Sequence, residues 1–437
     1  MTYVLVPRLV SSRIGGSAMR AAAEVWVGAL GKDPHEHDVR LTTVGGPELI
    51  IGEWDKTHAA QHIWHATCAI PRPAARREIK LIVDRAEVTS AHVSPLPNAL
   101  CEGPFRVLLA SCFDPGFSRS RRLKRRLEEL GTEGQPHVKL LCGDQVYLDP
   151  TFPSCLALTC LSPERRAASI YRRTWTNPGF QALLGEGLNV FCPDDHDFWD
   201  NYTVDAGRRE PRRAKVAKGL LHAFQSAAPL QTFDVPPLRF MIVDTRGHRT
   251  DPLCLSPQVV DDSVLRQVVS WLSKDEGPAV LVLGQPLLGE VGYEPGRHGS
   301  DILQYKGQFQ QLADALLDAP CSVVILSGDV HWGRVAYGTN RRGKALVEVI
   351  SSPLSLSRLR SLAECFRPWR PAVPDLGSER GCIKTAVTYK VTTPHFATLD
   401  FTTSVGNSAA VSMVVSAWPL RKPLCRAVKP VTYRCTL

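Results

Sequence analysis

Two patterns of apolar and polar positions divide the chain. Up to about residue 93, short segments in which apolar and polar residues alternate are separated by turn residues such as Gly45-Gly46-Pro47. From about residue 104, unbroken apolar runs alternate with segments whose apolar residues recur three and four positions apart. Alternation with a period of two predicts half-buried strands, whereas the second pattern predicts buried strands separated by helices.

The first pattern predicts a small β-rich domain over residues 1–98. Several short strands with turns between them are typical of a β-sandwich. Pro95 and Pro97 exclude both helix and central strand at their positions, so this stretch is predicted to be a linker. The pattern predicts no definite structure for the opening residues. The strands it predicts are Asp38–Val44, Leu49–Trp54, His62–Ile70 and Glu78–Val88.

The second pattern predicts a layered α/β domain over residues 99–437. A last block at about 380–420 returns to alternation, and we expect it to complete the sheets. The segments with helical spacing are Arg119–Leu130, Leu265–Ser273 and Gln308–Leu317. The predicted buried strands are Phe105–Ala110, His137–Cys142, Leu188–Cys192, Leu238–Val243, Ala279–Leu283, Ser322–Leu326 and Leu346–Ile350.

Composition excludes several classes of protein. The 437 residues are 44% hydrophobic and 22% charged, which excludes disorder as the main state. The formal net charge of +9 favours anionic ligands only weakly. No apolar run approaches the ~20 residues of a membrane helix, and charged residues interrupt every candidate signal-peptide core. The 13 cysteines are an odd number and form no C-x-x-C pair, so with no export signal we expect a cytoplasmic protein with reduced thiols. With no membrane segment, we expect no membrane partner.

Polar residues of metal-binding type follow five of the predicted strands. Because ligands bind outside the carboxyl ends of strands in α/β sheets, we expect these side chains to gather at one edge. A single Asp after a strand is more often a helix cap, but five coincident strand ends favour a shared site. In chain order the residues are Ser111 and Cys112; Asp144 and Tyr147; Asp194, Asp195, His196 and Asp197, with Asn201 shortly after; Asp244 and Arg246; and Asp329 and His331.

The chemistry of this set indicates a site with more than one metal ion. Carboxylate, imidazole, thiolate, phenolate and amide oxygen are all metal ligands in proteins. Several crowded carboxylates repel each other and raise one another's pKa unless cations neutralise them. Two neighbouring ions can clamp a phosphoryl group and convert a bound water to hydroxide at neutral pH.

The order of these motifs resembles that of the PhoD-like phosphatases, within the calcineurin-type metallophosphoesterases. The resemblance spans roughly residues 105–350, and the N-terminal β-rich region resembles the small sandwich that precedes the catalytic domain in that family. It implies a layered metallophosphoesterase-type β-sheet sandwich flanked by helices. The matching segments are Ala110-Ser111-Cys112, Gly143-Asp144-x-x-Tyr147, Asp194-Asp195-His196-Asp197 with Asn201, Asp244-Thr245-Arg246, Gly328-Asp329-Val330-His331 and, more weakly, Trp271-Leu272 followed by Leu283-Gly284-Gln285.

The resemblance also implies roles for individual residues. Asp144 and Asp329 would reach both a ferric iron and one or more calcium ions, and Asn201 would be a further calcium ligand. The catalytic group would comprise His196, as a hydrogen-bond donor to phosphate or the leaving-group acid, with Asp195, and with Arg246 helping to hold the site. Phe113 and His248 depart from the residues usual in the family. The ligands implied for iron are Cys112, Asp144, Tyr147, Asp329 and His331.

Two functions remain open from the sequence. The first is a metal-dependent phosphatase or phosphodiesterase that hydrolyses phosphate esters by attack of a metal-bound hydroxide, with nucleic acid possible only as a substrate. The alternative is a polyanion or nucleic-acid binding protein with a degenerate metal site, which would use two basic clusters. The first cluster comprises Arg119, Arg121, Arg122, Lys124, Arg125 and Arg126, and the second comprises Arg208, Arg209, Arg212, Arg213, Lys215 and Lys218.

Two further signals favour ordinary interpretations. Gly338-x-x-x-x-Gly343-Lys344 approaches a phosphate-binding P-loop, but Ala345 replaces the required Ser or Thr and an apolar β-run follows. We therefore predict a turn between two strands there. Cys112 could act as a nucleophile, but cysteine hydrolysis does not account for the other strand ends.

Overall fold

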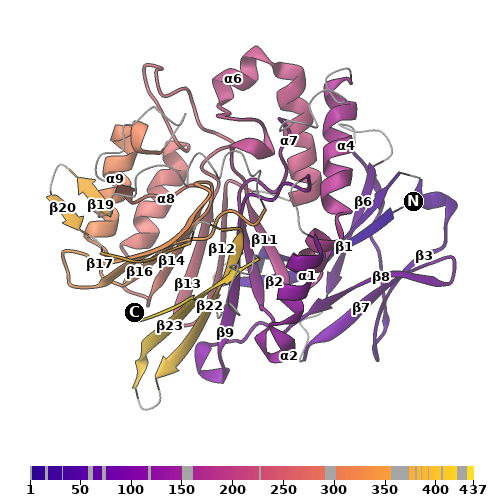
Figure 1. Cartoon of the computed structure of the whole chain (residues 1–437), viewed down its shortest axis with the longest axis horizontal. Helices are drawn as coiled ribbons and strands as arrows, with labels where there is room; N and C mark the ends of the chain where they lie inside the picture. The colour runs from indigo at the N-terminus through magenta and orange to yellow at the C-terminus, as the bar shows by residue number, and fades with distance from the viewer. Residues whose placement is uncertain are drawn as a thin grey trace.

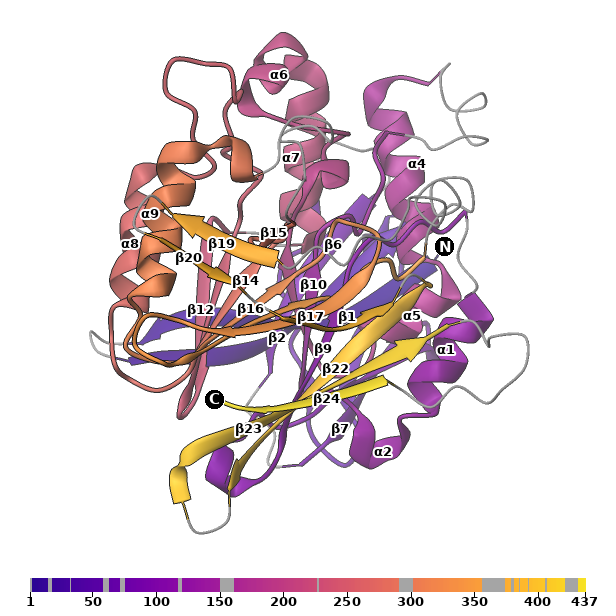
Figure 2. The ribbon, with the colours of Figure 1, turned by 60° about the vertical axis from the view of Figure 1, so that its left-hand side comes forward.

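The computed structural model contains two large β-sheets packed face to face, with helices on both outer faces (Figures 1 and 2). It describes residues 2–14, 18–31, 33–57, 63–70, 75–116, 120–149, 161–225, 228–290, 302–355, 374–378, 381–384, 386–391, 393–404, 407–420 and 431–437. The ten-stranded sheet has the order β24 (Val431–Thr436), β23 (Asn407–Pro419), β22 (His395–Ser404), β9 (Phe105–Ala110), β10 (Val138–Cys142), β11 (Leu188–Cys192), β1 (Thr2–Ile14), β2 (Ala18–Leu30), β6 (Ile63–Ile70) and β5 (Asp55–Lys56).

The second large sheet has seven strands, and two small sheets complete the β-structure. The seven-stranded order is β12 (Leu230–Val235), β13 (Leu238–Val243), β14 (Ala279–Leu283), β16 (Val323–Ser327), β18 (Ala345–Ile350), β17 (Gly333–Thr339) and β21 (Ala386–Val391). The small sheets are β4 (Glu48–Leu49), β3 (Val39–Thr43), β7 (Arg77–Val83) and β8 (Ala86–Val93), and β15 (Gly289–Glu290), β19 (Pro374–Ser378) and β20 (Gly381–Lys384).

Helices cover the outer face of each large sheet. Against the ten-stranded sheet lie α1 (Ser120–Glu128), α4 (Pro163–Trp175), α5 (Pro178–Leu184) and α7 (Pro211–Gln225), and against the seven-stranded sheet lie α8 (Asp262–Leu272) and α9 (Lys306–Leu317). Figure 1 shows α8 and α9 at the left and α4 and α7 at the upper right. The short helices α2 (Gly131–Gly134) and α6 (Val204–Arg209) lie outside these layers, with α6 at the top of the view.

The central strands read as continuous apolar runs because both of their faces are buried. In β9, Val107 and Leu109 join the core between the two sheets, whereas Leu108 and Ala110 join the core beneath the helices. The strands β9, β10 and β11 are parallel, and so are β13, β14, β16 and β18. The predicted layered α/β architecture is therefore confirmed, and the strands predicted at Phe105–Ala110 and Leu238–Val243 have the predicted bounds.

The N-terminal region differs from its prediction in several details. The opening residues form a long antiparallel hairpin, β1–β2, and β1 pairs in parallel with β11 at Arg8 and Asn189. The strand predicted over Glu78–Val88 is two strands, β7 and β8, because Asp84 and Arg85 form a turn with φ of 50° and 70°. Of the predicted strand Leu49–Trp54, only Leu49 lies in a strand.

The ten-stranded sheet continues across the predicted domain boundary at residue 98, since β1, β2, β5 and β6 belong to it. The strands β3, β4, β7 and β8 form a sheet of their own. The division into two domains stays a prediction. Among the described residues, no helix combines the length and the apolar character needed to cross a bilayer.

A buried histidine beneath the end of β17 predicts a pH effect on stability. His395 is fully buried, donates from Nδ1 to the carbonyl of Thr393 at 2.8 Å, and presents Nε2 to Gly333. Burial, partly offset by the bond to Thr393, lowers the pKa of His395 to about 4. Below pH 6.5 the unfolded chain therefore binds a proton that the folded chain does not, so stability falls as the pH drops from about 6.5 to 4.

This loss amounts to about 3 kcal/mol in total, at 1.4 kcal/mol per pKa unit. His395→Leu removes the titrating group, and we expect it to flatten the pH dependence in this window by that amount, whatever its effect on absolute stability. Urea unfolding of both proteins at several pH values between 4.5 and 7 measures the slopes. If the free energy of unfolding fell equally with pH in both proteins, His395 would not be the source of the pH dependence.

Candidate metal centre

The candidate site lies where the carboxyl ends of the parallel strands of both large sheets meet. Among the described residues, seven non-glycine residues have positive φ, and five of them are predicted site residues. This conformation is uncommon outside glycine and is found where the fold needs a particular side-chain direction. The backbone strain is therefore concentrated where the sequence predicts ligands: Cys112, Asp144, Asn201, Asp329 and His331.

Asp144 is the centre of the first group of ligand atoms. One ligand atom from each of Cys112, Asp144 and His331 lies within 4.8 Å of the others. The Cys112 Sγ lies 3.4 Å from Oδ2 of Asp144, and the hydroxyl of Tyr147 donates to the same oxygen at 3.3 Å. The structure thus brings a thiol, a carboxylate, an imidazole and a phenol together.

Further carboxylates adjoin this group. Ligand atoms of Asp194, Asp195 and Asp329 lie within 4.8 Å of one another, and so do those of Asp144, Asp195 and His196. Oδ1 of Asp195 accepts from the backbone N–H of His196 at 3.1 Å. Oδ2 of Asp194 is buried without a hydrogen-bond partner among the described residues. The site therefore extends across at least two adjoining groups of anionic ligands.

The electrostatics of these groups call for positive charge. Burial, together with the neighbouring carboxylates, raises the pKa values of Asp144 and Asp329 well above their ordinary value. Burial also raises the pKa of Cys112 and that of Tyr147 well above their ordinary values, with Asp144 contributing to both. Without a cation these ligands favour their protonated forms, and a bound metal would favour the anionic forms.

Asp197 ties two of the ligand-bearing loops together. Its Oδ2 accepts from the backbone N–H groups of Asp144 at 3.0 Å and Asp194 at 3.1 Å. Its Oδ1 accepts from the backbone N–H of Val146 at 3.2 Å and from Nε2 of Gln225 at 2.9 Å. All four acceptor positions of the carboxylate are occupied, so Asp197 positions the ligand loops and is not free to bind an ion.

Two buried arginines support the carboxylates from the side of the seven-stranded sheet. Arg246 is fully buried, and its Nε donates to Oδ1 of Asp194 at 2.8 Å. Arg249 donates to Oε1 of Gln285 at 2.7 Å, and Nε2 of Gln285 donates to Oδ2 of Asp329 at 2.9 Å. The structure thus brings Arg246 to the carboxylates as a buried hydrogen-bond donor.

His196 is held by two neighbours that orient its ring. Its Nδ1 lies 2.7 Å from Oδ1 of Asp149, and its ring packs on that of Tyr147 with centroids 4.4 Å apart. Nε2 lies 3.8 Å from the exposed carboxylate of Asp200. Burial favours the neutral ring, but the surrounding carboxylates raise the pKa of His196 well above its ordinary value.

Asn201 lies at the exposed rim of the site. Its backbone N–H donates to Oδ2 of Asp195 at 2.8 Å, and its side-chain amide donates to Asp200 at 3.2 Å. Asp195 is therefore held by the backbone on both oxygens, and its ligand atoms lie near those of Asp144 and His196 and also near those of Asp194 and Asp329. The role of Asn201 as a metal ligand stays a prediction.

The two residues that differ from those usual in the PhoD-like family, Phe113 and His248, lie outside the groups of ligand atoms. Phe113 is fully buried and stacks on Phe180 with centroids 4.5 Å apart, beneath the helices. His248 is partly exposed and lies 3.4 Å from Asp261. Neither side chain belongs to a group of ligand atoms among the described residues.

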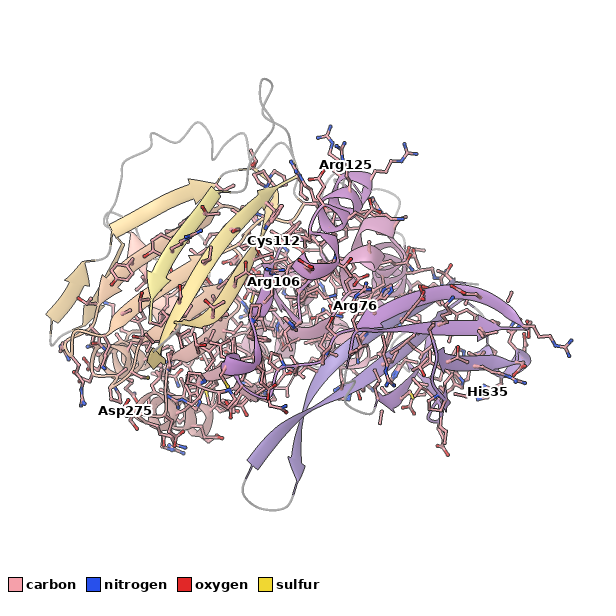
Figure 3. All side chains as sticks on the ribbon, turned by 90° about the horizontal axis from the view of Figure 1, so that it is seen from below. His35, Arg76, Arg106, Cys112, Arg125 and Asp275 are labelled. Carbon is pink, nitrogen blue, oxygen red and sulfur yellow. The ribbon has the colours of Figure 1, made fainter. Side chains whose placement is uncertain are left out.

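Several arginines of the two basic clusters form ion pairs with nearby acids. In the second cluster, Arg212 contacts Glu164 at 2.6 Å, and Arg208 and Arg213 pair with acids three residues before them. In the first cluster, Arg125 and Arg126 pair with Glu129. Figure 3 shows Arg125 at the surface. Arg119 lies outside the described residues.

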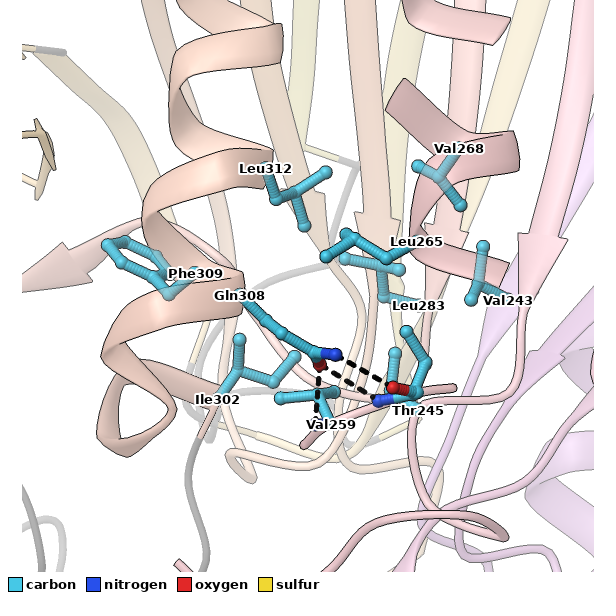
Figure 4. Close-up of a pocket in the computed structure, with 11 residues that line it drawn as sticks. Val243, Thr245, Val259, Leu265, Val268, Leu283, Ile302, Gln308, Phe309 and Leu312 are labelled. Atoms are coloured by element: carbon cyan, nitrogen blue, oxygen red, sulfur yellow. Dashed lines mark hydrogen bonds between the residues drawn. The ribbon is translucent and has the colours of Figure 1, made fainter. Parts of the chain in front are cut away.

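A separate apolar cavity of about 30 Å³ lies between α8, α9 and the seven-stranded sheet (Figure 4). Its lining includes Val268 of α8, Leu312 of α9 and Thr245, and Gln308 closes one side through hydrogen bonds to the backbone of Val259 and Val260. Its lining is mainly apolar and includes none of the candidate metal ligands, so it is separate from the site.

Sequence reasoning missed four residues that hold the predicted ones in place. Asp149 lies two positions after Tyr147 in the same polar loop, which is a signal that could have indicated it. Gln285 belongs to the weakest of the matching motifs, and the motif alone gives it no role. Arg249 and Ser352 carry no local signal, because their contacts to site residues are formed only by the tertiary fold.

Comparisons with known proteins identify the fold. No protein-family model and no curated protein matches the sequence. Among solved structures, the chain is similar to the structure of PhoD, with a TM-score of 0.68 and 12% sequence identity over 98% of this chain and 88% of that chain. The structure of GAP50, the anchor in the inner membrane complex of Plasmodium, gives a TM-score of 0.38 and 11% identity over 73% of this chain and 85% of that chain, too low to support a common fold. The fold implied by the resemblance is thus confirmed: the chain has the α/β fold of PhoD.

Proposed function

We propose that this protein is a metal-dependent phosphoesterase, which hydrolyses phosphate mono- or diesters. The observation that supports it most is the convergence of Cys112, Asp144, Tyr147 and His331 from the ends of different strands. The similarity of fold to PhoD, a protein whose motifs this chain resembles, adds to it.

The donor set fits metal ions of two kinds. Thiolate, phenolate and imidazole together suit a transition metal, and phenolate favours a hard trivalent ion such as ferric iron. Carboxylates suit calcium, and Asp329 and Asp195 are placed for a second ion beside the first. When bound, these metals would supply Lewis-acid activation of water and neutralise charge on the phosphoryl group.

The residues of the chain would orient the substrate and move a proton. Asp149 accepts the Nδ1 proton of His196, which fixes the tautomer and leaves Nε2 to hold the proton that is transferred. His196 would give this proton to the leaving oxygen as the ester bond breaks. Arg246 and Asp197 keep the carboxylates in register, and the ring of Tyr147 keeps His196 beside them.

The alternative, a polyanion-binding protein with a degenerate metal site, has less support. In the second basic cluster, three arginines are already paired with acids, which lowers the charge available to a polyanion. Backbone strain is also concentrated at the candidate ligands, and such strain is typical of active sites.

Hydrolysis of p-nitrophenyl phosphate and bis(p-nitrophenyl) phosphate by the purified chain tests the function. We expect release of p-nitrophenol from at least one of them, and its loss on chelation. A protein that binds oligonucleotides tightly but cleaves neither ester would favour the alternative.

A further inference from the structure

The hydroxyl of Ser352 lies between two candidate ligands. Ser352 follows β18 and is fully buried. Its Oγ lies 3.1 Å from Sγ of Cys112 and 3.0 Å from the backbone nitrogen of His331. Because an N–H group can only donate, Oγ is the acceptor for His331, and the hydroxyl proton remains for the sulfur.

The backbone fixes the position of this hydroxyl. The N–H of Leu354 donates to the carbonyl of Ser111 at 2.7 Å, and the N–H of Ser355 donates to the carbonyl of Cys112 at 3.0 Å. The segment after β18 is thus bound along the segment after β9. Ser352 therefore faces the sulfur because two main-chain segments are held in register.

A second serine beside the same sulfur provides a natural comparison. Ser111 is also fully buried, but its Oγ lies 3.5 Å from the sulfur and 3.0 Å from the carbonyl oxygen of Ser351. A hydroxyl has one proton, and the closer carbonyl is the better acceptor. Ser111 thus contacts the sulfur only at this longer distance and shares its one proton with the closer carbonyl.

We propose that Ser352 is a positioning residue of the metal centre, whose hydroxyl donates a hydrogen bond to the Cys112 thiolate while its oxygen holds His331. This rests on the metal site of the proposed function and not on the hydrolytic activity. A hydrogen bond to a ligand sulfur withdraws electron density from it and tunes the bound metal. Loss of such a partner typically costs 10–100-fold in metal affinity.

Titration of the metal-stripped full chain with Co²⁺ tests this through the thiolate-to-cobalt charge-transfer absorption. We expect Ser352→Ala to move this band to longer wavelength and to weaken Co²⁺ binding about 10–100-fold. Ser111→Ala is the matched comparison, and its band and affinity should change much less than those of Ser352→Ala, because the Ser111 hydroxyl lies farther from the sulfur. Ser352→Thr retains the hydroxyl and should retain the band position.

Three results would overturn the proposal: a wild-type band and affinity in Ser352→Ala, an equal change in Ser111→Ala, or a band that persists in Cys112→Ser. If Ser352→Ala does not fold, Ser352→Gly removes the same hydroxyl and decides by the same criteria. The function fails separately, because a protein with the expected bands that cleaves no phosphate ester would refute the phosphoesterase and leave this role of Ser352 intact.

Discussion

Asp144→Asn is expected to lower the hydrolysis rate by at least ~10²-fold, and so is Asp329→Asn. Each change keeps the size of the side chain and removes the negative charge of a carboxylate that we propose to be shared between metal ions. We expect Asp144→Asn to lower the rate more than Asp329→Asn does, because Oδ2 of Asp144 lies beside both Cys112 and Tyr147. The measurement is turnover of p-nitrophenyl phosphate with the bound metal determined on the same samples.

The control for this pair is Asp275→Asn, which removes one negative charge at the exposed surface, far from Cys112 (Figure 3). Its turnover and metal content should match those of the wild type. If Asp144→Asn and Asp329→Asn both retained the wild-type rate, the metal centre would not be where the strand ends place it.

His196→Ala is expected to lower turnover by ~10² to 10⁴, the usual range for a lost proton donor. Since His196 is not needed in the group formed by Cys112, Asp144 and His331, the metal content should stay near normal. The loss should be smaller for p-nitrophenyl phosphate than for an alkyl phosphate, because p-nitrophenolate leaves without needing a proton.

The comparison of leaving groups separates proton transfer from positioning. Asp149→Asn removes the charge that faces Nδ1, so it should change turnover in the same direction as His196→Ala but less strongly. An equal loss on good and poor leaving groups would refute the acid role of His196 and leave it as a hydrogen-bond donor to phosphate.

The central strands could be predicted from the sequence because burial on both faces leaves an unbroken apolar run. In β9, successive residues such as Val107 and Leu108 face different cores, and both are apolar. Those candidate ligands that come directly after such a strand, as Cys112 comes after β9, could also be predicted. The order of motifs then gave the fold, which the similarity to PhoD confirms.

The N-terminal hairpin could not be predicted, because its strands contain residues that usually interrupt apolar runs. Arg8 is buried, stacks over Trp26 at 5.0 Å and donates to the carbonyl of Phe224. A sequence pattern counts such an arginine as exposed, whereas the fold supplies an aromatic face and an acceptor for it. Its partners come from distant parts of the chain.

The supporting residues of the site escaped prediction for a related reason. Ser352 and Gln285 contact Cys112 and Asp329 through space, and neither lies within 40 residues of its partner. Nothing in the local sequence distinguishes them from other polar residues after strands. The roles of Asn201 and of the metals implied for the site stay predictions.

We propose that the chain hydrolyses phosphate esters only when a metal is bound by Cys112, Asp144, Tyr147 and His331. The most direct test is a titration in which metal is added back to the metal-stripped wild-type chain. Bound metal, visible absorption and the hydrolysis of p-nitrophenyl phosphate and bis(p-nitrophenyl) phosphate are measured on the same samples. We predict that hydrolysis rises in proportion to bound metal and that ferric iron gives a charge-transfer colour that shifts in Tyr147→Phe. Full hydrolysis by the stripped chain, or stoichiometric metal binding without hydrolysis of either ester, would contradict the account.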